Sequence, residues 1–455
     1  MAVSPRTPGP RLPAHPDPEL DRILRGGLPH ELAYAFGGPF HLLLPDRFEA
    51  NAAAFRAALA EAGVDGLVHY AKKANKAAAW IERCAATGTG VDVAAAGELR
   101  EALGHGVRGE HIVVTGPAKA DDLLRVAVLQ GCLIAVDALD ELDRVIALAR
   151  ATRPARLLLR RLPPAQPRSR FGLDDAELGT ALARCEEARD AVRMEGFSFH
   201  LSGYAVQPRA ELAGDLVDLC LKARAAGLPA DRISIGGGFA VDYAAAGDWE
   251  RFLREQGPGD YHAGKSFTTS DFYPYHSPVA GADALRAVLA TRPRGGTTTL
   301  AARLKDAGIT LLLEPGRALL DRAGCTVFTV RGVKERDGYG ILTVDGTSLS
   351  LSEQWFNSEY LPDPVLLTAG DRPAGPPFRA CVGGATCLES DLLTWRKVVH
   401  PTRPHPGDLL VYPNTAGYQM DSNESPFHDL PLPPKVVLDT AGGRTRWRLD
   451  RHPAT

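Results

Sequence analysis

The sequence predicts an α/β protein in which a (β/α)8 TIM barrel is followed by an all-β C-terminal domain. Short apolar runs alternate eight times with helix-like stretches over about 250 residues, which is what such a barrel needs. From Cys325 onward the apolar runs are separated by turn residues alone, which is typical of a β domain. The eight predicted barrel strands are Gly66–Ala71, Gly90–Val93, His111–Thr115, Cys132–Val136, Ala155–Leu159, Gly196–Phe199, Arg232–Ile235 and Thr310–Leu313.

Four segments follow from this pattern. Residues 1–35 begin rich in proline and lack the apolar run of a secretory signal, so we expect a flexible tail. Residues 36–45 contain an apolar strand that we assign to the β domain. Residues 46–322 form the barrel, and residues 323–455 form the C-terminal β domain.

The barrel helices are marked by amphipathic spacing and by glycines that end them. The interval between the seventh and eighth strands is too long for one helix, and residues 266–278 within it are rich in aromatic side chains. Two expectations stay open for this loop: a lid or substrate wall, or a surface ornament on the helix ring. The predicted helices after the first are Ala77–Ala86, Gly97–Leu103, Asp121–Leu129, Glu141–Arg150 and Asp174–Arg193.

Composition narrows the function classes. The 455 residues carry a net charge of −3, which argues against nucleic acid or an anionic membrane as the main partner. No apolar run approaches the roughly 20 residues that a membrane-spanning helix requires. Seven cysteines without a CxxC motif indicate a reducing compartment, so we expect a cytoplasmic protein.

Reactive groups of a TIM barrel lie where its strands end. The first strand ends at Lys72 and Lys73, and either amine would suit attack on an aldehyde if it were partly desolvated. Strand alternation lets only one of the two face the barrel mouth, and the residues themselves leave that choice open.

The last two strands end in groups that suit a phosphorylated cofactor. Gly236, Gly237 and Gly238 follow the seventh strand, where backbone N–H groups of this fold commonly bind phosphate. Glu314 and Arg317 follow the eighth, where a carboxylate can hold a ring nitrogen protonated and a guanidinium can neutralise phosphate. Each feature also has a plain structural interpretation, a tight turn or a rim ion pair, and only their combination indicates a cofactor held by an imine.

From about Gly38 to Leu432 the chain resembles the fold-type III pyridoxal-phosphate (PLP) enzymes, and in particular their two-domain decarboxylases. This family includes ornithine and diaminopimelate decarboxylases, and its barrel is shared with alanine racemases. The segment from Tyr70 to Asn75 is similar to the family's YAxKAN motif, which implies that Lys73 forms the internal aldimine with PLP.

The resemblance also assigns roles to the other barrel residues. Asp92 would lie near the imine, His200 would stack on the cofactor ring, and Glu314 would hold the pyridine nitrogen. The cofactor-binding set that it implies is Lys73, Arg160, His200, Ser202, Gly236, Gly237, Gly238, Glu314, Gly316, Arg317 and Tyr418.

In the β domain, residues 384–391 resemble the family's GPTCxxxD motif, and residues 416–418 resemble its GAY. The first match implies that Cys387 is a general acid that reaches the neighbouring subunit's site, and the second that Tyr418 reaches the phosphate. We therefore expect a homodimer with two shared active sites.

Three departures from the family pattern affect the site. The family's HxGS becomes His200-Leu-Ser-Gly, which moves the hydroxyl to Ser202. Leu388 replaces the acidic residue that follows the cysteine, and Glu389 would point to the other face of a strand. We expect Leu388, Glu389 and Asp391 to form the substrate-binding set, and the distal group of the substrate not to be a simple ammonium. The spacing from Tyr418 to Phe427-His428 also differs slightly from the family's Tyr to Phe-Asn.

The predicted function is PLP-dependent decarboxylation of an amino acid or an amino-acid conjugate through an external aldimine. Lys73 would be the Schiff-base lysine and Cys387 the general acid, with His200 and Asp92 completing the catalytic set. A PLP-dependent racemase or epimerase is the alternative. An inactive decarboxylase-like binding protein is less favoured, because Lys73 and Cys387 are both present. No metal is expected.

Overall fold

The computed structural model describes residues 9–351, 358–370, 372–373, 375–439 and 445–450. These residues divide into two compact units.

The barrel unit comprises Phe48–Ala240 and Val279–Leu319. The β unit comprises the described residues of Met1–Arg47, Val241–Pro278 and Leu320–Arg451.

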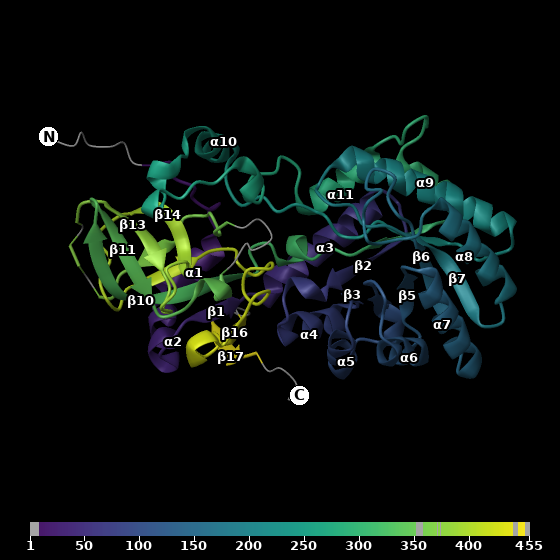
Figure 1. The fold of residues 1–455 in the computed structure, drawn as a ribbon, viewed down its shortest axis with the longest axis horizontal. Helices are drawn as coiled ribbons and strands as arrows, with labels where there is room; N and C mark the ends of the chain where they lie inside the picture. Colours follow the sequence, from purple (N-terminus) through teal and green to yellow (C-terminus); the bar gives the residue numbers. More distant parts are fainter. Residues whose placement is uncertain (1–8, 352–357, 371, 374, 440–444, 451–455) are drawn as a thin grey trace. The chain divides into compact units, whose positions relative to one another are not determined.

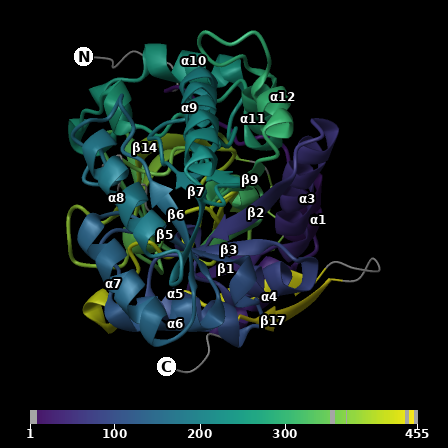
Figure 2. The same ribbon diagram turned by 90° about the vertical axis from the view of Figure 1, so that its right-hand side faces the viewer.

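The barrel unit is a closed ring of eight parallel strands in chain order, enclosed by helices (Figure 2). Strand β2 pairs with both β3 and β9, which closes the ring. The predicted TIM barrel and all eight of its strands are confirmed to within a few residues. The strands are β2 Gly66–Ala71, β3 Gly90–Val93, β4 Ile112–Val114, β5 Leu133–Val136, β6 Ala155–Arg160, β7 Val192–Ser198, β8 Arg232–Ser234 and β9 Thr310–Leu313.

One helix is shorter than predicted. Helix α8 ends at Glu187, and Arg193 lies in β7. The charged residues at the start of β7 are typical of an exposed helix, which is why the helix was predicted to continue there. In the structure Glu195 of β7 is buried and accepts hydrogen bonds from Arg156 of β6 at 2.8 and 3.0 Å. The helices of this unit are α3 Pro45–Glu61, which begins in the β unit, α4 Ala78–Thr87, α5 Ala96–Gly104, α6 Asp121–Gln130, α7 Leu139–Ala151, α8 Asp175–Glu187, α9 Val206–Ala225, α11 Gly281–Ala290 and α12 Leu300–Asp306.

The β unit is built on a mixed sheet of nine described strands, in which β10, β11, β13 and β14 lie side by side (Figure 1). Strand β1, Phe40–Leu43, pairs antiparallel with β10 and parallel with β16. Strand β14, Leu392–His400, was not predicted, because Arg396 and Lys397 interrupt its apolar pattern. The remaining strands are β10 Gly324–Arg336, β11 Tyr339–Val344, β12 Val365–Leu367, β13 Phe378–Gly383, β15 Leu409–Tyr412, β16 Lys435–Asp439 and β17 Arg446–Leu449.

The flexible tail predicted for residues 1–35 is wrong from Pro18 onward, where the chain forms helices α1 (Pro18–Arg25) and α2 (Leu28–Phe36). Asp17 caps α1, and its Oδ1 accepts hydrogen bonds from the N–H groups of the second and third residues that follow. Leucine and isoleucine side chains of both helices are buried in one core with strand β1. The proline-rich start of the chain concealed this amphipathic pair. Residues 1–8 of the expected tail lie outside the described residues.

The aromatic segment 266–278 belongs to the β unit, with helix α10 (Ala246–Glu255). The expectation of an ornament on the helix ring of the barrel is therefore wrong, whereas a lid or substrate wall stays a prediction. Phe272 packs against Phe252 of α10 with ring centroids 5.5 Å apart, and Tyr275 packs against Tyr243 at 5.5 Å. These side chains are buried, so they form part of the core of this unit.

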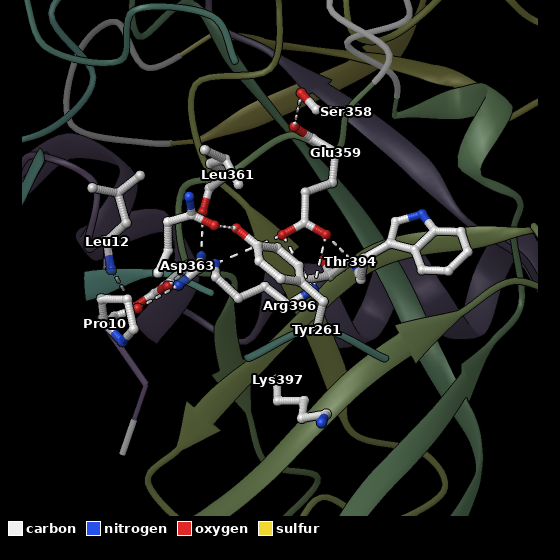
Figure 3. Close-up of polar contacts among 12 residues, drawn as sticks. Pro10, Leu12, Tyr261, Ser358, Glu359, Leu361, Asp363, Thr394, Arg396 and Lys397 are labelled. Atoms are coloured by element: carbon white, nitrogen blue, oxygen red, sulfur yellow. Dashed lines mark hydrogen bonds and ion pairs between the residues drawn. The ribbon is translucent and has the colours of Figure 1, made fainter. Parts of the chain in front are cut away.

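A buried ion network connects three stretches of the β unit. Figure 3 shows the guanidinium of Arg396 between the carboxylates of Glu359 and Asp363. Its Nη2 is 2.7 Å from Asp363 Oδ1, and its Nη1 donates to the carbonyl of Pro10 at 3.1 Å. The Arg396 side chain is only 3% exposed, and burial raises the pKa of Glu359 to about 7. Such charges are tolerated because they compensate one another.

Replacing Arg396 by Met should therefore leave the buried carboxylate of Glu359 and the partly buried carboxylate of Asp363 without the guanidinium that lies between them. We expect the free energy of unfolding to fall by about 3–5 kcal/mol in urea denaturation. The matched control is Arg403→Met, which breaks the exposed pair of Arg403 with Glu335 and should cost at most about 1 kcal/mol. Equal losses in the two variants would show that the buried network does not stabilise the unit.

Three buried imidazoles make stability depend on pH. Burial lowers the pKa of His41 to about 3, and the pKa values of His69 and His400 to about 4, from the ordinary 6.5. In the folded protein these rings therefore stay neutral at pH 5, whereas in the unfolded chain they bind a proton below pH 6.5. The unfolded state binds more protons between these limits, so stability falls as the pH falls from about 6.5 to about 4.

The rings of His69 and His400 have pKa values of about 4. At pH 5 each of them should lower the free energy of unfolding by about 2 kcal/mol relative to its value at pH 7.5. We expect the thermal midpoint of His400→Asn to fall less between pH 7.5 and pH 5 than that of the unmodified protein. The exposed His405 provides the control, since His405→Asn should leave the pH dependence unchanged. A His400→Asn protein with the unmodified pH dependence would contradict this assignment.

No helix among the described residues has the length and apolar character needed to cross a membrane.

Candidate active site

A cavity of about 350 Å³ lies at the carboxyl ends of the barrel strands. Four of the predicted site residues border it: Lys73, Arg160, His200 and Glu314. The full lining is Lys73, Ala94, Thr115, Gly116, Pro117, Ala135, Arg160, Arg170, Phe171, Ser198, Phe199, His200 and Glu314.

The structure separates the two adjacent lysines. Lys73 borders the cavity, and its Nζ is 3.1 Å from Asp92 Oδ2. Lys72 does not line the cavity, because its side chain is buried and its Nζ is 2.6 Å from Glu101 Oε2. The cavity amine is thus that of Lys73.

Asp92 stands at the end of β3 and is only 2% exposed. Its Oδ1 accepts a hydrogen bond of 2.6 Å from the hydroxyl of Thr115, which follows β4. One carboxylate therefore connects the ends of three strands and orients the amine of Lys73. Thr115 was not predicted, since a lone threonine after a strand belongs to none of the motifs.

Glu314 follows β9 and accepts a hydrogen bond of 2.6 Å from the hydroxyl of Ser234, the last residue of β8. Burial raises the pKa of Glu314 to about 7, and the negative charge of Asp92 adds to this effect. The Ser234 hydrogen bond and the charges of Lys73 and Arg160 act in the opposite direction. The carboxyl group can therefore hold or share a proton near neutral pH. Ser234 was also not predicted as a site residue.

His200 and Arg160 form another wall. The ring of His200 borders the cavity, and desolvation by the surrounding protein, with the positive charges of Lys73 and Arg160, lowers its pKa to about 4. Its imidazole is therefore neutral at pH 7. Arg160 pairs with Asp137 at 3.0 Å, and its guanidinium lies 4.5 Å from the ring centroid of Phe171. Asp137 and Phe171 were missed, because neither stands in a recognisable motif.

The glycine run after β8 adjoins this wall. Gly236 and Gly238 have φ angles of +66° and +81°, which favour glycine, and a Cβ on Gly237 would lie 2.6 Å from the carbonyl oxygen of Glu314. Buried Arg209 supports the run by donating to the carbonyl of Ile235 at 2.8 Å. Within the described chain, the backbone N–H groups of Gly237 and Gly238 donate to no protein acceptor, so they can receive an anion.

The other predicted phosphate contacts do not line the cavity. Gly316 precedes a short 3₁₀ turn over Arg317–Leu320, and Arg317 is 6% exposed. Ser202 is exposed.

The remaining predicted residues lie in the β unit. Cys387, Leu388 and Glu389 are exposed on the loop between β13 and β14. Asp391 is buried, and its carboxylate accepts hydrogen bonds from the backbone of Ser348 at 2.8 Å and the hydroxyl of Thr386 at 2.8 Å. The Asp391 carboxylate thus organises the loop that presents Cys387.

Tyr418, also in the β unit, has a φ of +74°.

Comparison with known proteins defines the family. A family model described as "Pyridoxal-dependent decarboxylase, pyridoxal binding domain" matches residues 46–254. A diaminopimelate decarboxylase of Actinosynnema pretiosum is 30% identical over 88% of this chain and 84% of its own length. The chain belongs to the pyridoxal-dependent decarboxylase family. PLP is therefore its cofactor, and amino-acid decarboxylation is its class of reaction.

Other similar proteins match nearly the whole chain. An uncharacterized protein, y4yA of Sinorhizobium fredii, is 38% identical over 92% of both chains. The diaminopimelate decarboxylase of M. jannaschii, solved with L-lysine, has a TM-score of 0.73 at 20% identity and covers 94% of this chain and 92% of its own. A lysine/ornithine decarboxylase of Vibrio vulnificus, solved with putrescine, has a TM-score of 0.67 at 21% identity and covers 93% and 99%. At these identities the solved structures confirm the fold.

Proposed function

We propose that this protein decarboxylates an amino acid or an amino-acid conjugate, with Lys73 as the lysine that binds PLP and Cys387 as the general acid. The observation that supports this most strongly is the separation of the two lysines. Only Lys73 borders the cavity in which Glu314 and His200 also lie, while Lys72 is buried against Glu101.

Residues that line the cavity and residues near it fit PLP group by group. The amine of Lys73 suits the aldehyde, and the carboxyl group of Glu314 suits the pyridine nitrogen. The neutral ring of His200 offers a flat, uncharged surface to a stacked ring. The two unpaired N–H groups of the glycine run offer donors to phosphate, and Ser202, Gly316 and Arg317 complete the cofactor contacts that we propose.

When bound, PLP supplies an electron sink for the electron pair released as carbon dioxide leaves the substrate. Glu314 holds a proton at the pyridine nitrogen, which its raised pKa allows. Asp92 holds the amine of Lys73 at 3.1 Å, so that the amine is positioned both before and after the substrate displaces it. Arg160 is held in place by Asp137 and borders the same cavity.

Cys387 returns a proton to the α-carbon after carbon dioxide has left. Its thiol is exposed, unlike those of the six other cysteines, which are buried. In the resembling family this cysteine serves the neighbouring subunit's site, so we include a homodimer with shared sites, to which Tyr418 also contributes.

The substrate differs from a simple diamine precursor at its distal end. Leu388 is 50% exposed beside Cys387, where the resembling decarboxylases carry an acidic residue. An apolar side chain there cannot pair with a distal ammonium group. Asp391 cannot replace the acid, because its oxygens already bind the loop. We propose an amino acid whose distal part is carboxylated or bulky.

The function is tested by incubating the PLP-loaded protein with a panel of amino acids and conjugates in heavy water. We expect mass spectrometry to show a product that has lost carbon dioxide and gained one deuterium at the α-carbon, with ornithine and lysine as poor substrates. Exchange of the α-hydrogen without loss of carbon dioxide would assign a racemase or epimerase instead.

The lysine assignment is tested by reducing the PLP-loaded protein with borohydride and locating the pyridoxyl group by peptide mass spectrometry. Lys73→Ala should abolish the adduct, because it removes the cavity amine. Lys72→Ala is the matched control and should retain the adduct, since that amine faces Glu101. The reverse result would overturn the assignment.

A further inference from the structure

The thiol of Cys387 has an imidazole partner. Its Sγ lies 3.3 Å from Nε2 of His428, although the two residues are 41 positions apart in the chain. The ring of His428 packs edge-on against Phe427, with ring centroids 4.4 Å apart. His428 has a φ of +62°, in the left-handed region that residues with a side chain seldom occupy. The turn thus directs this imidazole to the thiol.

This partner does not follow from the family pattern. The resembling decarboxylases carry Phe-Asn where this chain carries Phe427-His428. An asparagine amide can donate a hydrogen bond to sulfur but cannot exchange a proton near neutral pH, whereas an imidazole can. Both Cys387 and His428 are exposed in the described chain, so the imidazole can exchange protons with water.

We propose that Cys387 and His428 share a proton. His428 is then the positioning residue that returns a proton to the Cys387 thiolate in each turnover. This inference rests on the proposed role of Cys387 as general acid. The S–H bond breaks as its proton passes to the α-carbon that has lost carbon dioxide, leaving a thiolate. The neutral imidazole of His428 then takes a proton from water, and the N–H of the imidazolium so formed gives its proton to Sγ, which restores the S–H bond. No oxidant or further reactant is needed.

Thiol reactivity measures this pair without measuring decarboxylation. Six of the seven cysteines are buried, and burial raises the pKa values of Cys132, Cys185, Cys220, Cys325 and Cys381 to about 12. Iodoacetamide applied to the folded PLP-loaded protein should therefore modify Cys387 first. Peptide mass spectrometry can follow the rate of this modification from pH 6 to pH 10.

The test compares the unmodified protein with His428→Asn, which restores the family's residue, and with His405→Asn, which removes an exposed imidazole elsewhere in the β unit. At pH 7 we expect Cys387 to react about tenfold more slowly in His428→Asn, because the imidazole no longer accepts the thiol proton. Near pH 10 the rates should converge, since the thiolate forms without help. His405→Asn should match the unmodified protein throughout.

Identical pH profiles in the unmodified protein and His428→Asn would overturn the proposal. A difference that is constant over the whole pH range would also overturn it, because it would indicate altered access to the thiol. The proposed function fails separately: a pH-dependent difference in thiol reactivity without any release of carbon dioxide would support the proton-sharing pair and contradict the decarboxylase assignment.

Discussion

The ion pair of Lys73 with Asp92, between two neighbouring strands, is the contact on which the candidate site depends, and closure of the barrel brings Glu314 to the same cavity. Asp92 ends β3 beside the end of β2, and Thr115 after β4 binds its second oxygen at 2.6 Å. Because β9 pairs with β2 on the other side, Glu314 borders the same cavity. In an open sheet the last strand would lie far from the first, and Glu314 would not lie near Lys73.

Several charged groups lose water at this site, and each has a partner that compensates. Asp92 is paired with Lys73, Arg160 with Asp137, and Glu314 accepts from the neutral hydroxyl of Ser234. Only Glu314 lacks a direct cation among these contacts, and its pKa is raised to about 7. Glu314 can thus carry a proton, while Asp92 holds the amine of Lys73. Glu314 therefore suits the pyridine nitrogen of the cofactor, and Asp92 suits the amine that the cofactor's aldehyde would meet.

Sequence reasoning predicted the features that repeat or that stand in motifs. The eight barrel strands were predicted because their apolar runs are buried on both faces, and Glu314 and the glycine run were predicted because they follow strands. Thr115, Ser234 and Asp137 were missed, since each acts through one partner that is distant in the chain. Strand β14 was missed because Arg396 is charged and yet buried, a condition that only its two carboxylate partners explain.

A crystal structure of the protein grown with PLP would show most directly whether the cofactor is bound to Lys73 inside this cavity. We expect continuous electron density between Lys73 Nζ and the cofactor, with a carboxylate oxygen of Glu314 within hydrogen-bond distance of the pyridine nitrogen. Density that joins the cofactor to Lys72, or a cofactor bound outside the cavity, would contradict it.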